Sequence, residues 1–227
     1  MSVRLENIEK VYKLGEIPVQ ALSDVSLQLS KGEFVAIMGP SGSGKTTLLN
    51  LIGVLDKPTK GEIYINGKNI TKLKDRELTG LRRNTVGYIF QFYNLIPVLS
   101  AFENVELPML ISGTPKKERE ERAHLLLEKV GLHGREKHRP DELSGGEQQR
   151  VAIVRALANK PSVVLADEPT GDLDSKTGKD VMQALRDLSR NEGATVIVVT
   201  HDSMVANLAS RIFEMKDGRI IRVRNTK

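Results

Sequence analysis

A glycine-rich loop between two apolar segments is the feature that most constrains how this chain folds. An apolar run at 34–38 precedes the loop, and apolar residues recur at helical spacing over 48–55. The loop has the pattern G-x-x-x-x-G-K-[ST] and comprises Gly39, Pro40, Ser41, Gly42, Ser43, Gly44, Lys45 and Thr46. Between a strand and a helix, this pattern predicts that backbone N–H groups and the helix N-terminus hold phosphate groups. We expect Lys45 to reach the β- and γ-phosphates and the Thr46 hydroxyl to hold Mg²⁺. A glycine-rich turn without a ligand would need all of these positions to be filled by chance.

Composition excludes several other kinds of chemistry. The 227 residues include no cysteine, which excludes disulfides, thiolate metal sites and thiol nucleophiles. The longest apolar stretches, such as 195–199, are of strand length and far shorter than the roughly 20 residues that span a bilayer. Residues 1–6 show no secretory signal, so we expect a cytoplasmic protein. The net charge of +5 comes from interspersed charges of both signs, which predicts a solvated surface and no nucleic-acid partner.

The first third of the chain is predicted to be largely β-structure. Residues 3–11 and 21–29 alternate between apolar and polar side chains, which favours antiparallel strands, and 61–67 predicts a further strand with a hairpin turn. A short helix at 75–83 and a buried strand at 85–90 follow. That strand delivers Gln91 at its C-terminal end, where polar residues of α/β proteins bind ligands.

The middle of the chain is predicted to be helical. Thr114 and Pro115 suggest the N-cap and the first position of a helix over 116–130. A second helix is predicted to start at Ser144, where Glu147 completes a capping box, and to continue through an apolar series to 157.

An α/β pattern then returns and brings a second acidic site. A strand at 163–166 ends in Asp167 and Glu168, and an amphipathic helix over 177–189, closed by Gly193, leads to a strand at 195–199 and to a last hairpin at 217–218. Asp167 is expected to hold Mg²⁺, and Glu168 is placed to polarise a water that faces the γ-phosphate, which predicts hydrolysis. An acidic strand end that is merely solvated is the alternative.

Residues 143–150, Leu-Ser-Gly-Gly-Glu-Gln-Gln-Arg, resemble the signature of the ATP-binding subunits of ABC transporters. The resemblance covers essentially the whole chain. Tyr12 resembles the aromatic residue that stacks on adenine, Gln91 the glutamine of the Q-loop, Asp174 within 171–174 the D-loop, and His201 the switch histidine. The tracts 165–171 and 103–108 are similar to those of the subgroup that serves lipoprotein release, macrolide export and cell division.

The resemblance implies an α/β fold with three parts. A P-loop NTPase core, which is a mostly parallel sheet with flanking helices, would carry an N-terminal antiparallel β-subdomain and an inserted α-helical subdomain with the signature. We expect one domain over 1–227, with the core and its antiparallel part at 1–91 and 160–227 and the helical subdomain at about 92–159.

The resemblance also implies a mechanism and its partners. Two ATP molecules with Mg²⁺ would be sandwiched in a head-to-tail homodimer, each between the glycine-rich loop of one chain and the signature of the other. Glu168 would activate the attacking water, assisted by Gln91, Lys45 and His201. Besides the loop, the implied nucleotide-binding residues are Tyr12, Thr47, Gln91, Ser144, Gly145, Gly146, Asp174 and His201, and the implied Mg²⁺ ligands are Thr46, Gln91 and Asp167. A separate membrane-spanning permease subunit would dock near Phe92–Pro108, so that the chain lies peripherally on the inner face of the cell membrane.

Simpler interpretations remain for single residues. Tyr12 could be an ordinary strand aromatic, His201 a structural histidine and Asp174 a helix cap, and the apolar stretch 92–99 could pack within the helical arm. Where the family signature usually has glutamine, this chain has Glu147. We expect its carboxylate to point back to the Ser144 N–H and not toward the nucleotide.

Other functional classes also stay open at this point. A soluble ABC-type ATPase of DNA maintenance or translation is the main rival, although no long heptad insertion separates Lys45 from Ser144. A P-loop kinase lacks such a signature helix. An ATP-gated scaffold that regulates a membrane partner with little turnover is the non-enzymatic alternative.

Overall fold

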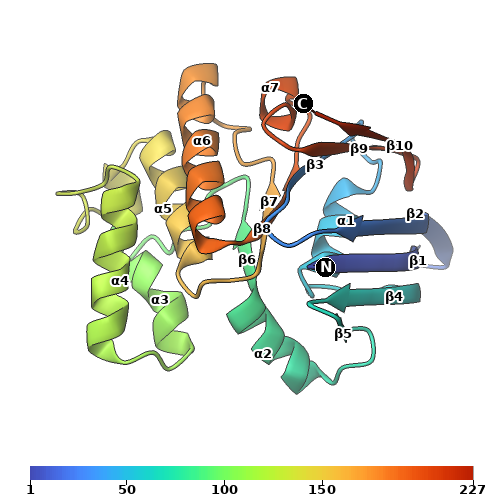
Figure 1. Cartoon of the computed structure of the whole chain (residues 1–227), viewed down its shortest axis with the longest axis horizontal. Coiled ribbons are helices and arrows are strands. Elements are labelled where there is room, and N and C mark those ends of the chain that lie inside the picture. Colours follow the sequence, from blue (N-terminus) through green and yellow to red (C-terminus); the bar gives the residue numbers. More distant parts are fainter. Residues whose placement is uncertain (227) are drawn as a thin grey trace.

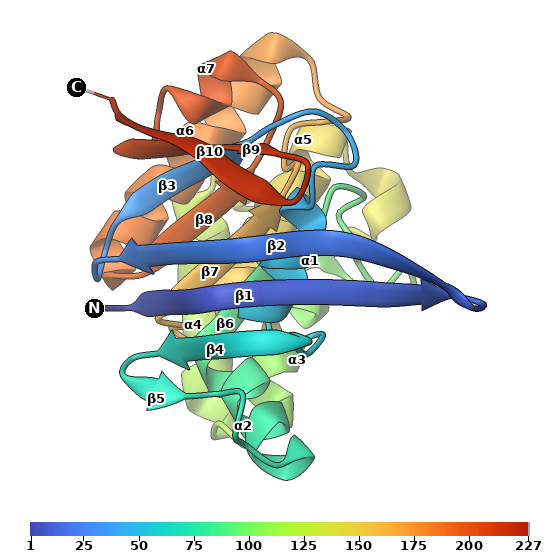
Figure 2. The same cartoon turned by 90° about the vertical axis from the view of Figure 1, so that its right-hand side faces the viewer.

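In the computed structural model, which describes residues 1–226, the first sheet is antiparallel and has the order β2–β1–β4–β5. Its strands are β1 (Val3–Leu14), β2 (Ile17–Leu29), β4 (Lys60–Ile65) and β5 (Lys68–Asn69). Val25, Leu27 and Leu29 of β2 are buried, while Ser26 and Gln28 between them are exposed. The predicted alternation is therefore confirmed, and Figure 2 shows this sheet facing the viewer.

The second sheet has six strands in the order β10–β9–β3–β8–β7–β6. All neighbours are parallel except the terminal hairpin of β9 and β10. Its strands are β3 (Phe34–Met38), β6 (Val86–Ile89), β7 (Val163–Asp167), β8 (Thr195–Val199), β9 (Arg211–Lys216) and β10 (Arg219–Asn225). This is the mostly parallel sheet that the resemblance implied.

Two hydrophobic cores cover the two faces of the parallel sheet. In β7, Val164 and Ala166 belong to the core beneath the helices, whereas Val163 and Leu165 belong to the core shared with the antiparallel sheet. Successive residues of a strand point to opposite faces, so a strand buried on both sides reads as a continuous apolar run.

The helices divide between these two cores (Figure 1). Helix α1 packs between the sheets, while α3, α4, α5 and α6 lie on the opposite side of the parallel sheet. The helices are α1 (Lys45–Ile52), α2 (Asp75–Thr85), α3 (Ala101–Ile111), α4 (Lys116–Lys129), the 3₁₀ turn η1 (Pro140–Glu142), α5 (Gly145–Leu157), α6 (Ser175–Glu192) and α7 (Ser203–Ala206).

The helical arm differs from the sequence prediction in two respects. Helix α3 was not predicted, although Ser100 and Glu103 form a complete capping box at its start. The predicted N-cap Thr114 is wrong by one residue, because the carbonyl of Pro115 accepts the N–H of Arg119 at 3.1 Å and Pro115 is therefore the cap of α4.

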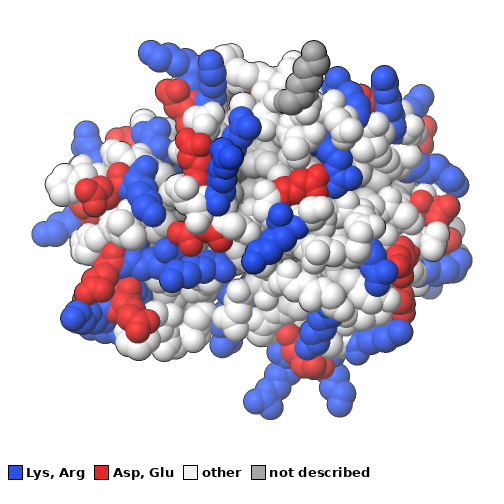
Figure 3. All heavy atoms as spheres, viewed as in Figure 1, with Lys and Arg blue, Asp and Glu red and all other residues white. Residues whose placement is uncertain are grey.

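Charges of both signs are interspersed over the face in Figure 3, as the composition predicts. Because β3, β6, β7 and β8 run parallel, the segments that follow them meet along one edge of the sheet. That edge carries the candidate functional site.

Candidate functional site

The glycine-rich loop joins the end of β3 to the start of α1. Gly42 and Gly44 have left-handed backbones with φ of 77° and 96°. A Cβ on Gly39 would lie 2.3 Å from the carbonyl oxygen of Met215, so no side chain fits there. The Lys45 ammonium folds back over the loop and donates to two of its carbonyls at 2.9 Å each. The loop thus requires glycine where the sequence has it.

The loop fits an anionic group such as a phosphate. Gly44 is the N-cap of helix α1 and offers no side-chain cap, so the first N–H groups of the helix are free to bind a ligand. The Ser43 hydroxyl is buried and has no hydrogen-bond partner among residues 1–226. A buried donor of this kind is normally satisfied, and a phosphate oxygen would satisfy it.

A cleft of about 620 Å³ opens over the loop. It brings together the loop and the predicted residues Thr46, Thr47, Gln91, Asp167, Glu168 and His201. These side chains come from the start of α1 and from the carboxyl ends of β6, β7 and β8. The arrangement of the parallel strands therefore collects residues that lie far apart in the sequence.

Asp167 and Thr46 form the part of the cleft that suits a cation. The Thr46 hydroxyl lies 3.4 Å from Asp167 Oδ1. Burial raises the pKa of Asp167, and the neighbouring Glu168 charge acts in the same direction, while the hydrogen bond from Thr46 opposes them. A bound cation would stabilise the ionised carboxylate.

These oxygen donors fit Mg²⁺, which is usually bound by one or two carboxylates together with substrate phosphates. No cluster of three or more histidine, cysteine or acidic side chains within residues 1–226 could cage a metal alone, so phosphate oxygens would complete the shell. Thr46 and Asp167 would hold the ion, and Gln91 lines the same cleft. The ion would neutralise charge that develops on the phosphates.

Glu168 and His201 meet at the rim of the cleft. Nδ1 of His201 lies 3.0 Å from Glu168 Oε2. The backbone of Glu168 is left-handed, with φ of 45°, and its N–H donates to the carbonyl of Val199 at 2.9 Å. A strained backbone held by neighbouring structure is common at functional sites. The carboxylate can accept a proton from water, and the imidazole can orient that carboxylate.

The signature residues do not line this cleft. Ser144 is instead the N-cap of α5, as predicted, and its hydroxyl accepts the N–H of Glu147 at 3.3 Å. Glu147 Oε2 accepts the Ser144 N–H at 2.8 Å, which confirms that this carboxylate points back to the cap. Gly145 and Gly146 form the first turn of α5.

Asp174 and Tyr12 also lie outside the cleft lining. Asp174 caps α6 by accepting the N–H groups of Lys176 and Thr177. Tyr12, which is 38% exposed, donates its hydroxyl proton to Asp56 at 2.9 Å. Its register partner Val19 does line the cleft. The nucleotide-binding roles of Asp174 and Tyr12 therefore stay predictions.

Sequence reasoning missed the contribution of β2. Val19, Gln20 and Ala21 line the cleft. A Cβ on Gly44 would lie 2.6 Å from the carbonyl oxygen of Ala21, so β2 packs tightly against the loop. No motif carries this contact, because it depends on how the antiparallel sheet packs on the core.

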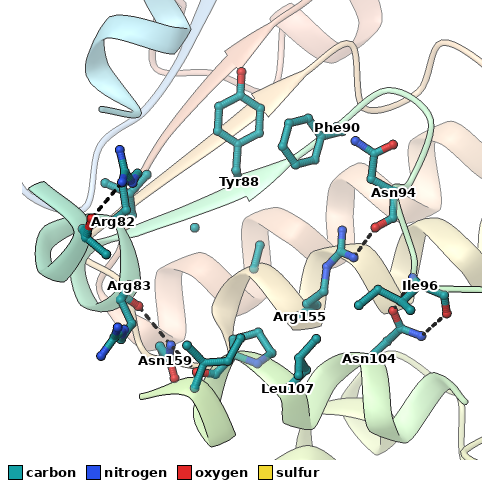
Figure 4. A pocket seen from close by; sticks show the side chains of 16 residues that line it. Arg82, Arg83, Tyr88, Phe90, Asn94, Ile96, Asn104, Leu107, Arg155 and Asn159 are labelled. Atoms are coloured by element: carbon teal, nitrogen blue, oxygen red, sulfur yellow. Dashed lines mark hydrogen bonds between the residues drawn. The ribbon is translucent and has the colours of Figure 1, made fainter. Parts of the chain in front are cut away.

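A second pocket, which we call the α2–α3 groove, has a volume of about 450 Å³. Figure 4 shows its walls, which come from α2, β6, the loop at 94–96, α3 and α5 and include Arg83, Tyr88, Phe90, Ile96, Leu107 and Arg155. Ile96, Leu110 and Ile111 are apolar and exposed at or beside the groove. The segment at 92–108, near which the permease was predicted to dock, is helical from Ala101, and its Leu95 packs against the core beneath the helices.

Comparisons with known proteins agree with this geometry. A family profile described as ABC transporter matches residues 22–171. An uncharacterised ABC transporter ATP-binding protein of Methanocaldococcus jannaschii, MJ0796, is 52% identical over 224 residues, which cover 97% of this chain and 95% of that protein. The macrolide export ATP-binding/permease protein MacB of Wolinella succinogenes is 52% identical over 218 residues, which cover 96% of this chain and 34% of that protein.

Similarity extends to solved structures. A dimeric structure of the ATP-binding cassette MJ0796 in a post-hydrolysis state, bound to ADP and Pi, matches with a TM-score of 0.90 and 50% identity over 99% of both chains. None of the helices in the described part of this chain combines the length and apolar character needed to cross a membrane. The chain therefore belongs to the ABC transporter family, as an ATP-binding subunit that hydrolyses ATP.

Proposed function

We propose that this chain drives an export or lipoprotein-release type transporter, with Glu168 as the general base of ATP hydrolysis. The observation that carries the assignment is the 3.0 Å contact between Glu168 and His201 in the cleft that also contains Lys45 and Asp167. Lys45 would bind the β- and γ-phosphates, and Thr46, Asp167 and Gln91 would hold Mg²⁺.

The ATP site is completed by a second copy of the chain in a head-to-tail dimer. Ser144, Gly145 and Gly146 are absent from the lining of the cleft, although they present a helix N-terminus suited to a phosphate. A partner chain would supply them to the γ-phosphate. The dimeric state of the similar cassette MJ0796 supports this arrangement. Loss of the γ-phosphate would then remove a bond between the two chains and let them separate.

A permease subunit docks in the α2–α3 groove. MacB carries a permease in the same chain, and the matched segment covers 34% of its length. A helix of the permease with an apolar face would cover Ile96 and Ile111, and an acidic residue on it would complement Arg83. This docking would hold the chain on the inner face of the cell membrane.

Replacing Glu168 by glutamine tests the assignment. The amide keeps the shape of the side chain but accepts a proton poorly, so turnover is expected to fall by about 10²–10⁴. Binding of a fluorescent ATP analogue should persist, and size-exclusion chromatography in ATP should show a trapped dimer. The matched control is Glu128→Gln, which changes an exposed glutamate on α4 and should leave all three measurements unchanged. Wild-type turnover by Glu168→Gln would refute the assignment.

A further inference from the structure

Helix α5 makes two side-chain contacts with segments that follow cleft residues. The fully buried Gln149 donates to the carbonyl of Pro169, which follows Glu168, at 2.6 Å. Farther along the helix, Arg155 donates to the carbonyls of Tyr93 and Asn94, at 2.7 and 2.5 Å. One rigid helix therefore holds the segments after Glu168 and after Gln91.

The turn that Arg155 grips has an unfavourable backbone. Tyr93 and Asn94 both have left-handed conformations, with φ of 56° and 48°. Two successive residues of this kind are costly outside glycine and persist only where surrounding groups hold them. The planar guanidinium presents parallel N–H groups that match two successive carbonyls. Arg155 thus supplies the contact that such a turn needs.

The side chain of Tyr93 also contacts the signature segment at 143–150. A Cβ placed on Gly145 would lie 2.9 Å from the Tyr93 hydroxyl oxygen, so this hydroxyl rests directly against the first turn of α5. The turn is therefore fixed at two points of the same helix, its start and its last turn. Gln91, two residues earlier, lines the ATP cleft.

The surroundings of Arg155 indicate that its guanidinium is held by specific hydrogen bonds and not by packing alone. Burial lowers the pKa of its guanidinium, and no carboxylate within residues 1–226 forms an ion pair with it. A half-buried cation without a counter-ion destabilises a fold unless it makes specific hydrogen bonds. Figure 4 shows Arg155 directed across the groove at Asn94.

We propose that Arg155 is a positioning residue that clamps the Tyr93–Asn94 turn to α5 and so holds Gln91 in register with the ATP cleft. The proposal rests on the proposed role of Gln91 in the cleft. Without the clamp, the turn is free to leave its left-handed conformation, and Gln91 moves with it. Phosphate binding by the loop at 39–46 does not depend on the clamp.

The test compares Arg155→Met with Arg122→Met in the full-length chain. Arg122 is a matched control because it also donates to two backbone carbonyls, those of Leu157 and Ala158, at 3.0 and 2.9 Å, but it lies on α4 and away from the cleft. The first measurement is hydrogen–deuterium exchange of residues 92–98 without nucleotide. The second is kcat for phosphate release together with the affinity for a fluorescent ATP analogue.

Arg155→Met should raise exchange at 92–98 and lower kcat by about 10²-fold, the effect of a displaced active-site group. The affinity for the ATP analogue in the absence of Mg²⁺ should stay unchanged, because the loop at 39–46 binds the phosphates without the clamp. Arg155→Lys, which keeps the charge and can donate to one of the two carbonyls, should recover part of the rate. Arg122→Met should lower the melting temperature without either effect. If Arg155→Met does not fold, Arg155→Lys carries the same comparison.

Unchanged exchange at 92–98 would overturn the clamp, and raised exchange with an unchanged kcat would overturn the link to Gln91. These results are distinguishable from a failure of the proposed function. If Gln91 had no role in hydrolysis, Gln91→Ala would keep the wild-type kcat, whereas the exchange measurement involves no nucleotide.

Discussion

Replacing Asn104 by leucine will loosen the loop that forms one wall of the α2–α3 groove. Asn104 is fully buried on α3, and its Oδ1 accepts the N–H of Ile96 at 2.8 Å. Its Nδ2 lies 3.0–3.2 Å from the carbonyl oxygens of Ile96, Leu99 and Ser100. Leucine has nearly the same shape but offers no hydrogen bond to any of these groups.

The expected loss of stability depends on which backbone groups lose a hydrogen-bond partner. The carbonyl of Ile96 also accepts from the Leu99 N–H, and that of Ser100 accepts from the Asn104 N–H, so both stay bonded. The Ile96 N–H and the Leu99 carbonyl lose the bond to the side chain. Each such group costs about 1–3 kcal/mol when it is left unpaired away from water. Ile96 is 37% exposed, so we take the lower part of that range and expect a loss of about 2–4 kcal/mol.

A chain of this size loses about 2–4 °C of melting temperature per kcal/mol, so thermal unfolding without nucleotide should show a decrease of about 4–16 °C. Asn191→Leu, which alters an exposed asparagine on α6, is the control and should change stability by less than about 0.5 kcal/mol. Asn104→Asp keeps the bond from Ile96 but turns a carboxylate toward carbonyls. Its buried carboxyl should have a raised pKa, so the variant should be less stable at pH 8 than at pH 5. A melting temperature within 1 °C of wild type for Asn104→Leu would refute the reasoning.

Three further changes test separate parts of the molecule. Tyr12→Ala should weaken binding of a fluorescent ATP analogue by about 1–3 kcal/mol, by analogy with base stacking. Tyr12→Phe loses only the hydrogen bond to Asp56 and should bind the analogue nearly normally. Equal affinity of Tyr12→Ala and wild type would contradict stacking of Tyr12 on the adenine. Ile96→Asp should abolish co-purification with the permease and leave ATP-driven dimerisation intact, and retained co-purification of this variant would rule out docking there. Leu95→Asp should instead lower the melting temperature, because that side chain is partly buried and packs against the core. Asp167→Asn should raise the melting temperature without nucleotide. Burial raises the pKa of this carboxyl, so its ionised form destabilises the fold at any pH above the raised pKa. This destabilisation disappears below the pKa of the carboxyl in the unfolded chain. The same variant should lose the added stabilisation by ATP with Mg²⁺, and an unchanged melting temperature without nucleotide would show that the buried charge costs nothing.

The parts of the fold that sequence patterns predicted are those with local signals. Strand β7 was predictable because both of its faces are buried, which makes its sequence uniformly apolar. The start of α5 was predictable because Ser144 and Glu147 carry a capping box. The same signal stands at Ser100 and Glu103, but α3 escaped prediction because Pro108 lies inside it and its apolar residues show no clear helical period.

The residues of the candidate site also divide into those that a local sequence pattern marks and those that no local pattern marks. The glycine-rich loop, Asp167 and Glu168 could be predicted because a contiguous motif or a strand end marks each of them. Gln20 at the cleft and Arg83 at the groove could not, since the packing of β2 and α2 against the core brings them there and no local pattern reports it. Arg155 belongs to this second group, because its partners Tyr93 and Asn94 lie about sixty residues earlier in the chain.

The ATP cleft and the α2–α3 groove are adjacent because residues that directly follow β6 line both of them. Phe90 lines the α2–α3 groove and Gln91, the next residue, lines the ATP cleft. A displacement of Gln91 therefore reaches the groove through a single peptide bond, and the turn that follows can absorb or transmit it. The two hydrogen bonds from Arg155 to that turn favour transmission, since they tie it to the helix whose N-terminus carries the signature. Coupling between two sites needs an element with two arrangements that both sites bias. A turn with two left-handed residues, held by one side chain, is the segment of this chain best suited to that role.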